Sequence, residues 1–140
     1  MYKHILVPLD QSDLAETALP HAEAIARAMK ARLSIVVVSS LPDPNGTARA
    51  AWEAEIGTAG EYLKSVCSRF ADEKLLCASQ VIEGDIAEEI VRYAQDHDCD
   101  LIVMATHGRP GRERWVHGSV AEAVLATTAV PVLMVRAPEE

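Results

Sequence analysis

Residues 103–119, VMATHGRPGRERWVHGS, contain a glycine-bearing and arginine-rich segment between two apolar runs. An apolar run over 101–105 leads into this stretch, and a helix-like run of apolar and small residues begins at Gly118-Ser119. The residues between them include three arginines, although the chain has a formal net charge of -8. A strand, a glycine-bearing loop and a helix N-terminus in this order present backbone N–H groups to an anion. The stretch therefore predicts a loop that binds phosphate.

Apolar runs on either side of this stretch predict a sheet of five strands. We expect the strands at 4–9, 33–38, 75–82, 99–104 and 130–135. Apolar residues at helical spacing predict helices between them at 13–30, 47–73, 86–97 and 120–127. Pro20 interrupts the first of these, but the apolar stripe continues in phase beyond it, which favours one kinked helix. Strands that are apolar throughout and alternate with amphipathic helices indicate an α/β fold, a parallel sheet with helices on both faces.

Right-handed crossovers make this a doubly wound, Rossmann-like sheet. With strand order 3-2-1-4-5, numbered along the chain, the order reverses between the first and fourth strands. Ligands of such sheets bind outside the carboxyl ends of the strands at this reversal. Asp10, which follows the first strand, would then face the loop after the fourth strand across one crevice. Its carboxylate is suited to accept a hydrogen bond from a ribose hydroxyl, and equally to cap the first helix.

Composition bounds the class of protein. A chain of 140 residues is expected to form one domain, residues 1–140. An excess of 21 acidic over 13 basic residues argues against binding nucleic acid, and no apolar run approaches the roughly 18 residues that cross a membrane. The amino-terminal residues do not resemble a signal peptide. Three cysteines without CxxC spacing indicate reduced thiols in a cytoplasmic protein, and a metal site is not expected.

The two best-known phosphate motifs are absent from the sequence. The loop lacks the Gly-Lys-Ser/Thr end of a Walker A motif, and the first strand leads into DQSD rather than GxGxxG. Phosphate contacts would come from Gly108, from Gly118-Ser119 and from the three arginines, which are Arg109, Arg112 and Arg114. Alternatively, the glycines make a simple turn and the arginines are solvated. His107 and His117 are candidate bases, but no recognisable nucleophile motif accompanies them.

These residues give the chain a resemblance to the universal stress protein family over essentially its whole length. Residues 4–19, HILVPLDQSDLAETAL, resemble the family's first strand, Pro-x-Asp turn and first helix. Residues 83–111 are similar to its third helix and fourth strand. The family's nucleotide signature is Gly-x2-Gly-x9-Gly-Ser/Thr. It reads here as Ala105-Thr106-His107-Gly108, nine residues and Gly118-Ser119, so that alanine replaces the first glycine.

The resemblance implies the same 3-2-1-4-5 sheet and a bound ATP, with or without Mg²⁺. The ligand would lie between the end of the first strand and the loop after the fourth. The implied contact residues are Pro8, Leu9, Asp10, Val38, Ala105, Thr106, His107, Gly108, Arg109, Gly111, Gly118, Ser119 and Val120. The resemblance further implies a stress-response role and a homodimer formed through the last strand, Val132 to Val135.

Three hypotheses of function follow. In the first, the chain is a regulatory protein in which ATP or a related purine nucleotide orders the loop and biases binding of a protein partner not identified by the sequence. In the second, favoured by Ala105, it is an interaction module of the same fold without nucleotide. In the third, it is an enzyme that transfers phosphoryl or adenylyl groups. Because no clear general base or metal cluster is visible, we assign no catalytic residue and expect at most slow ATP hydrolysis.

Overall fold

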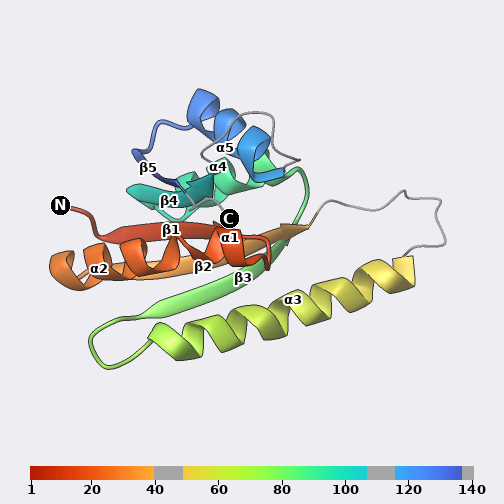
Figure 1. Ribbon diagram of the computed structural model, residues 1–140, viewed down its shortest axis with the longest axis horizontal. Coiled ribbons are helices and arrows are strands. Elements are labelled where there is room, and N and C mark those ends of the chain that lie inside the picture. Colours follow the sequence, from red (N-terminus) through yellow and green to blue (C-terminus); the bar gives the residue numbers. More distant parts are fainter. Residues whose placement is uncertain (40–48, 107–115, 137–140) are drawn as a thin grey trace.

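The computed structural model describes residues 1–39, 49–106 and 116–136, and these ranges contain one parallel sheet. Five strands pair in the order β3-β2-β1-β4-β5, and every pairing is parallel (Figure 1). The predicted fold class and strand order are confirmed. The strands are β1 His4–Leu9, β2 Arg32–Ser39, β3 Cys77–Glu83, β4 Leu101–Thr106 and β5 Val132–Arg136. The helices are α1 Asp13–Glu16, α2 Leu19–Met29, α3 Arg49–Phe70, α4 Ile86–Asp96 and α5 Val116–Thr127.

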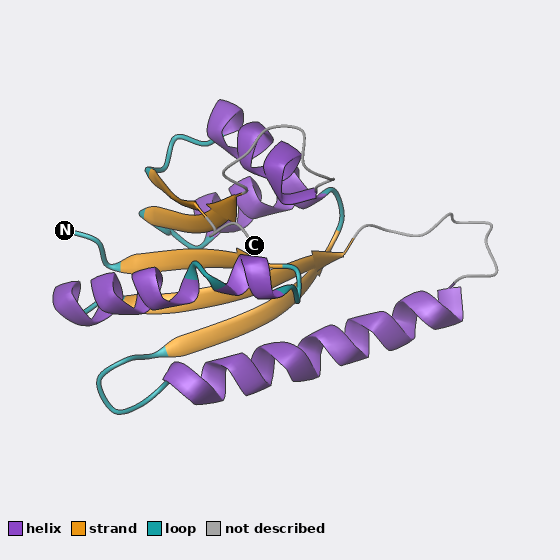
Figure 2. Ribbon diagram, viewed as in Figure 1, coloured by secondary structure: helices purple, strands orange, loops and turns teal. Residues whose placement is uncertain are grey.

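Helices cover both faces of the sheet, as the alternation of elements predicted (Figure 2). Successive side chains of a strand point to opposite faces. On the central strand β1, Ile5 and Val7 pack into a cluster with α1, α2 and α3, whereas Leu6 packs into a second cluster with α4 and α5. Because both faces are covered, all of β1 is buried. Because β1 is buried on both faces, its residues after His4 are all apolar and do not alternate with polar residues.

The expected single helix over residues 13–30 is wrong, because the chain forms two helices separated at Thr17 and Ala18. Pro20 lies in the first turn of α2, where its missing N–H costs no hydrogen bond. Inside a continuous helix it would remove a bond and crowd the preceding turn. The N–H groups of Thr17 and Ala18 instead bond three residues back, to the carbonyls of Leu14 and Ala15. Ser12 is the N-cap of α1, since its Oγ accepts from the N–H of Ala15 at 3.1 Å.

Several other boundaries differ from the sequence-based ones. The strand expected from residue 75 begins at Cys77, because Leu75 pairs with Asp72 in an isolated bridge within the preceding turn. The strand expected at 99–104 lies at 101–106, and the strand expected at 130–135 lies at 132–136. The last helix begins at Val116 rather than at residue 120. Gly118 and Ser119 therefore lie within the first turn of α5.

A chain of hydrogen bonds crosses the core at the amino ends of the strands. The Nδ1 of His4 lies 2.9 Å from the carbonyl oxygen of His97, and its Nε2 lies 2.6 Å from the Oγ of Ser34. Because a carbonyl only accepts, Nδ1 carries the proton, and the neutral ring accepts from Ser34 at Nε2. The Tyr93 hydroxyl donates to Ser34 Oγ at 3.2 Å. The geometry therefore fits neutral His4, and burial lowers the pKa of this residue.

We expect His4 to make the fold less stable in mild acid. Since its pKa is lower in the folded protein than in the unfolded chain, the unfolded chain takes up the proton first as pH falls. The contribution is intact above the ordinary histidine value of 6.5 and is lost below it. In urea titrations between pH 7.5 and 5.5, His4→Gln should flatten the decline in unfolding free energy. The exposed His21→Gln variant should keep the wild-type slope, and an equal slope in all three proteins would contradict the assignment.

Candidate functional site

The carboxyl ends of β1 and β4 mark the point where the strand order reverses. β1 pairs with β2 on one side and with β4 on the other, both in parallel register. The chain therefore leaves these neighbouring strands toward opposite faces of the sheet: β1 leads into α1, and β4 leads toward α5 (Figure 1). Diverging connections of this kind leave a space above the strand ends. Two hollows lie at this edge.

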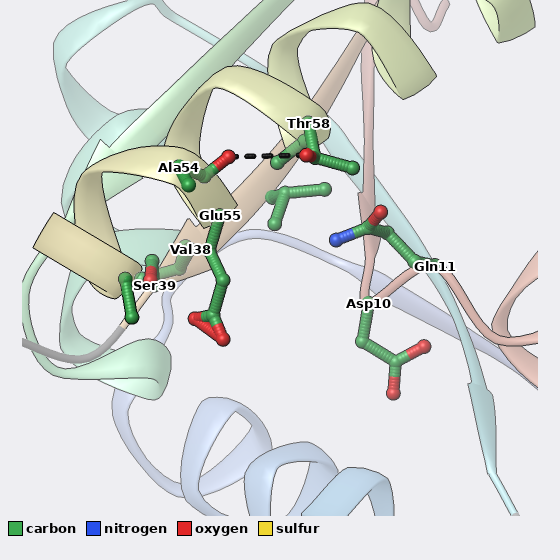
Figure 3. Close-up of a pocket in the computed structure, with 10 residues that line it drawn as sticks. Asp10, Gln11, Val38, Ser39, Ala54, Glu55 and Thr58 are labelled. Carbon is green, nitrogen blue, oxygen red and sulfur yellow. Dashed lines mark hydrogen bonds between the residues drawn. The ribbon is translucent and has the colours of Figure 1, made fainter. Parts of the chain in front are cut away.

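The larger hollow has a volume of about 450 Å³ and lies between the ends of β1 and β2 and the helix α3. This volume is within the range of small-molecule sites. Figure 3 shows Glu55 on the α3 wall and Asp10 with Gln11 on the opposite wall, and Val38 lies beside Ser39 at the end of β2. Its lining residues are Asp10, Gln11, Val37, Val38, Ser39, Ala51, Ala54, Glu55, Thr58 and Ala59. The hollow thus combines a small apolar floor with carboxylate and amide groups at its rim.

The turn after β1 is held in an uncommon conformation at this hollow. Gln11 has a φ of 70°, which non-glycine residues rarely adopt. Asp10 fixes the turn, because its Oδ1 accepts from the Ser12 N–H at 3.0 Å and from the Ser12 hydroxyl at 2.5 Å. The sequence suggested that Asp10 either caps α1 or contacts a ribose. The structure shows that Ser12 caps α1. Backbone strain next to a hollow is a feature of binding sites.

The α3 wall is anchored to α1 by polar contacts behind the larger hollow. The Tyr62 hydroxyl on α3 donates to Glu16 Oε2 on α1, and Arg69 Nη2 lies 3.2 Å from Glu16 Oε1. Burial, together with the bond to Glu16, raises the pKa of Tyr62, so that this phenol keeps its proton and its donor role. The position of Glu55 and Thr58 relative to Asp10 is therefore set by contacts outside the hollow.

The smaller hollow, of about 30 Å³, lies on the other side of Asp10 and Val38. Its lining is predominantly apolar and consists of Pro8, Leu9, Asp10, Val38, Ile86, Ile90, Met104 and Val120. Asp10 and Val38 line both hollows, so the two adjoin at the strand-order reversal. Five of the residues proposed from the sequence thus meet here, although they come from three separate parts of the chain.

Other residues proposed from the sequence are placed differently. Ala105 is 1% exposed and packs in the core cluster with α1, α2 and α3, and it lines neither hollow. Its methyl group, the departure from the family signature, is therefore accommodated by the core. Thr106 ends β4, and Ser119 is exposed in the first turn of α5. The proposed residues His107, Gly108, Arg109 and Gly111 lie outside the described residues, as do Arg112 and Arg114.

Sequence reasoning missed several lining residues. Glu55 and Thr58 approach the site through the packing of α3, for which the local sequence has no signal, whereas Gln11 follows Asp10 in the turn after β1. Ile86, Ile90 and Met104 belong to apolar stripes that resemble ordinary core positions. Across residues 1–39, 49–106 and 116–136, no group of three or more His, Cys, Asp or Glu side chains could hold a metal ion. None of the helices described is long and apolar enough to cross a membrane.

A third hollow, of about 500 Å³, lies at the opposite, amino edge of the sheet. It is bordered by Lys3, His4, Lys30, Ala31, Arg32, Lys74, Leu76, Asp98 and Asp100. Four of these residues are lysine or arginine, which makes this hollow a second possible destination for an anion. It lies at the far ends of the strands from Asp10.

The chain is thus a doubly wound α/β protein, and two adjoining hollows lie at its strand-order reversal. Comparison with known proteins extends this class to a family. A model of the universal stress protein family matches residues 1–136. Universal stress protein MJ0531 of Methanocaldococcus jannaschii is 37% identical over 147 aligned residues, covering 100% of this chain and 85% of the relative. The chain belongs to the universal stress protein family.

Solved structures agree with this membership. Universal stress protein UspA from Lactobacillus plantarum superimposes with a TM-score of 0.83 at 26% identity, covering 96% of this chain and 98% of that protein. A universal stress protein from Archaeoglobus fulgidus, solved in complex with dAMP, has a TM-score of 0.68 at 27% identity. That comparison covers 95% of this chain and 97% of the relative.

Proposed function

We propose that this chain binds a purine nucleotide, ATP first among them, at the carboxyl edge of its sheet. The observation that carries the proposal is the junction of two hollows at Asp10 and Val38, at the strand-order reversal. The adenosine part would occupy the crevice bordered by these residues. The structure of the Archaeoglobus fulgidus relative in complex with dAMP supports a purine nucleotide as the class of ligand.

Each part of the nucleotide would be held by residues of suitable chemistry. The Asp10 carboxylate is a charged acceptor for ribose hydroxyls, and Val38 offers an apolar surface for the base. The phosphates would extend toward Gly118 and Ser119, whose N–H groups belong to the first turn of α5. Arginines of the segment 107–115 would add charge-assisted contacts. Mg²⁺, where present, would arrive with the phosphates.

We further propose that ATP acts as a regulatory ligand in a cytoplasmic stress-response protein. Binding would order the loop after β4 and bias binding of a protein partner. The chain would form a homodimer through Val132 to Val135, since β5 is the terminal strand of the sheet and Leu133 on it is 36% exposed. No residue is assigned a catalytic role, and turnover of ATP would be slow at most.

Replacing Gly118 with valine should weaken ATP binding by about tenfold or more, because a branched side chain would crowd the proposed phosphate approach at α5. Isothermal titration calorimetry of ATP into both proteins measures this difference. Gly57→Val is the matched control, since a β-carbon at Gly57 on α3 meets no atom within 4 Å. Equal affinity of wild type and Gly118→Val would contradict the phosphate position. An absence of binding by the wild type would favour the interaction module without nucleotide.

A further inference from the structure

Two of the three cysteines lie in contact although they are ten positions apart in sequence. The Sγ atoms of Cys67 and Cys77 are 2.7 Å apart. Cys67 lies in the last turn of α3, and Cys77 is the first residue of β3. Both side chains are partly buried and pack at the margin of the core cluster that contains α2 and α3. Both are therefore held by the fold while part of each remains exposed to solvent.

The backbone on each side of the pair is fixed by hydrogen bonds. The Ala71 N–H bonds to the Cys67 carbonyl at 2.8 Å and closes the end of α3. Asp72 and Leu75 then form a bridge that turns the chain back. The Leu33 N–H bonds to the Leu76 carbonyl at 2.9 Å, and Leu33 pairs with Cys77 in the β2–β3 register. The contact between the two sulfurs thus follows from the docking of α3 beside β3.

We propose that Cys67 and Cys77 form an oxidisable dithiol, which a peroxide converts into an intramolecular disulfide. One sulfur attacks the peroxide, so that a sulfenic acid forms and one water leaves. The second thiol attacks this sulfenic sulfur, the S–S bond forms, and a second water leaves. Two thiols are oxidised, one hydrogen peroxide is reduced, and two waters result. The sulfurs need to approach by only a fraction of an ångström to reach the bond length of about 2.05 Å.

The surroundings of the two sulfurs affect how readily a thiolate forms. Burial and the adjacent Cys67 sulfur raise the pKa of Cys77, which disfavours its thiolate. Because the thiolate is the form that reacts with peroxide, the pair should react more slowly than an exposed cysteine, and either sulfur can be oxidised first. Burial raises the pKa of the third cysteine, Cys99, to about 12. Cys99 lies in the opposite core cluster and is the natural control.

The test uses the full chain, reduced and then treated with hydrogen peroxide before it is unfolded and alkylated with iodoacetamide. Wild-type protein should take up one alkyl group after peroxide and three without it, and dithiothreitol should restore three. Trypsin cleaves after Arg69, Lys74 and Arg92, which places each cysteine on a different peptide. Mass spectrometry should find the Cys67 and Cys77 peptides joined, with two hydrogens lost.

Variants and stability give independent readouts. Cys99→Ser should form the same disulfide, whereas Cys67→Ser and Cys77→Ser should show no joined peptides, because the remaining sulfur of the pair has no partner thiol and stops at the sulfenic or a higher acid. Oxidised wild type should melt on the order of 5–10 °C above reduced wild type, because the disulfide restricts the unfolded chain. Three alkyl groups on wild type after excess peroxide, or a disulfide through Cys99 or between two chains, would overturn the proposal. The wild-type peptide result stands even where a serine variant fails to fold.

Discussion

Replacing Asp10 with asparagine should weaken ATP binding by about 10- to 100-fold, the loss expected when a hydrogen bond to a charged acceptor is removed. Asp10 is the charged residue that lines both hollows at the strand-order reversal. Asparagine keeps an oxygen that can accept from the Ser12 N–H, so the turn after β1 is retained. The amide nitrogen that replaces the second oxygen cannot accept from a ribose hydroxyl. Calorimetric titration of ATP into both proteins gives the ratio.

A second variant, Asp96→Asn, controls for the loss of one negative charge from the protein. Asp96→Asn removes the same charge from an exposed position at the end of α4. It should leave ATP affinity within about twofold of wild type, because exposed charges far from a ligand are screened by salt. An Asp10→Asn variant that binds ATP as tightly as Asp96→Asn would remove Asp10 from the site. Unchanged urea unfolding of Asp10→Asn would show that the effect on binding is local.

Replacing Leu6 with alanine should lower the free energy of unfolding by about 2–5 kcal/mol, the range for deleting a buried leucine side chain. Leu6 is fully buried on β1 and packs in the cluster with α4 and α5. Since small proteins have about 5–15 kcal/mol of total stability, this one change removes a large share of it. Urea denaturation followed by circular dichroism measures the effect through the midpoint at unchanged slope.

Leu125 on α5 is the matched control for this truncation. Its side chain is 52% exposed, so Leu125→Ala should change stability by much less than Leu6→Ala. Equal losses in the two variants would contradict the assignment of β1 to the centre of the sheet, with helices packed on both faces.

The sheet could be predicted from sequence because the strands are buried on both faces and therefore apolar without alternation. The same reasoning failed at Pro20, where an apolar stripe in phase on both sides concealed a break between α1 and α2. Periodicity reports which face is buried, but it does not report whether backbone hydrogen bonds continue. The start of α5 was also misplaced, since Val116 to Ser119 are not strong helix formers and the helix includes them nonetheless.

Part of the candidate site could be predicted because parallel strands end at a common edge. Pro8, Leu9, Asp10 and Val38 follow or end strands, and Val120 follows the glycine-bearing loop. Glu55 could not be assigned to the site, because only the tertiary packing of α3 brings it there. The same holds for Cys67 and Cys77, since their spacing matches no redox motif and their contact arises from the turn between α3 and β3.

A crystal structure of the chain grown with saturating ATP tests the central claim most directly. We predict density for adenosine against Asp10 and Val38, with the phosphates directed toward Gly118 and Ser119 at the start of α5. Density at the amino-edge hollow bordered by Lys3 and Arg32 would contradict the proposed site. An empty crevice at both edges under saturating ATP would contradict the proposed function.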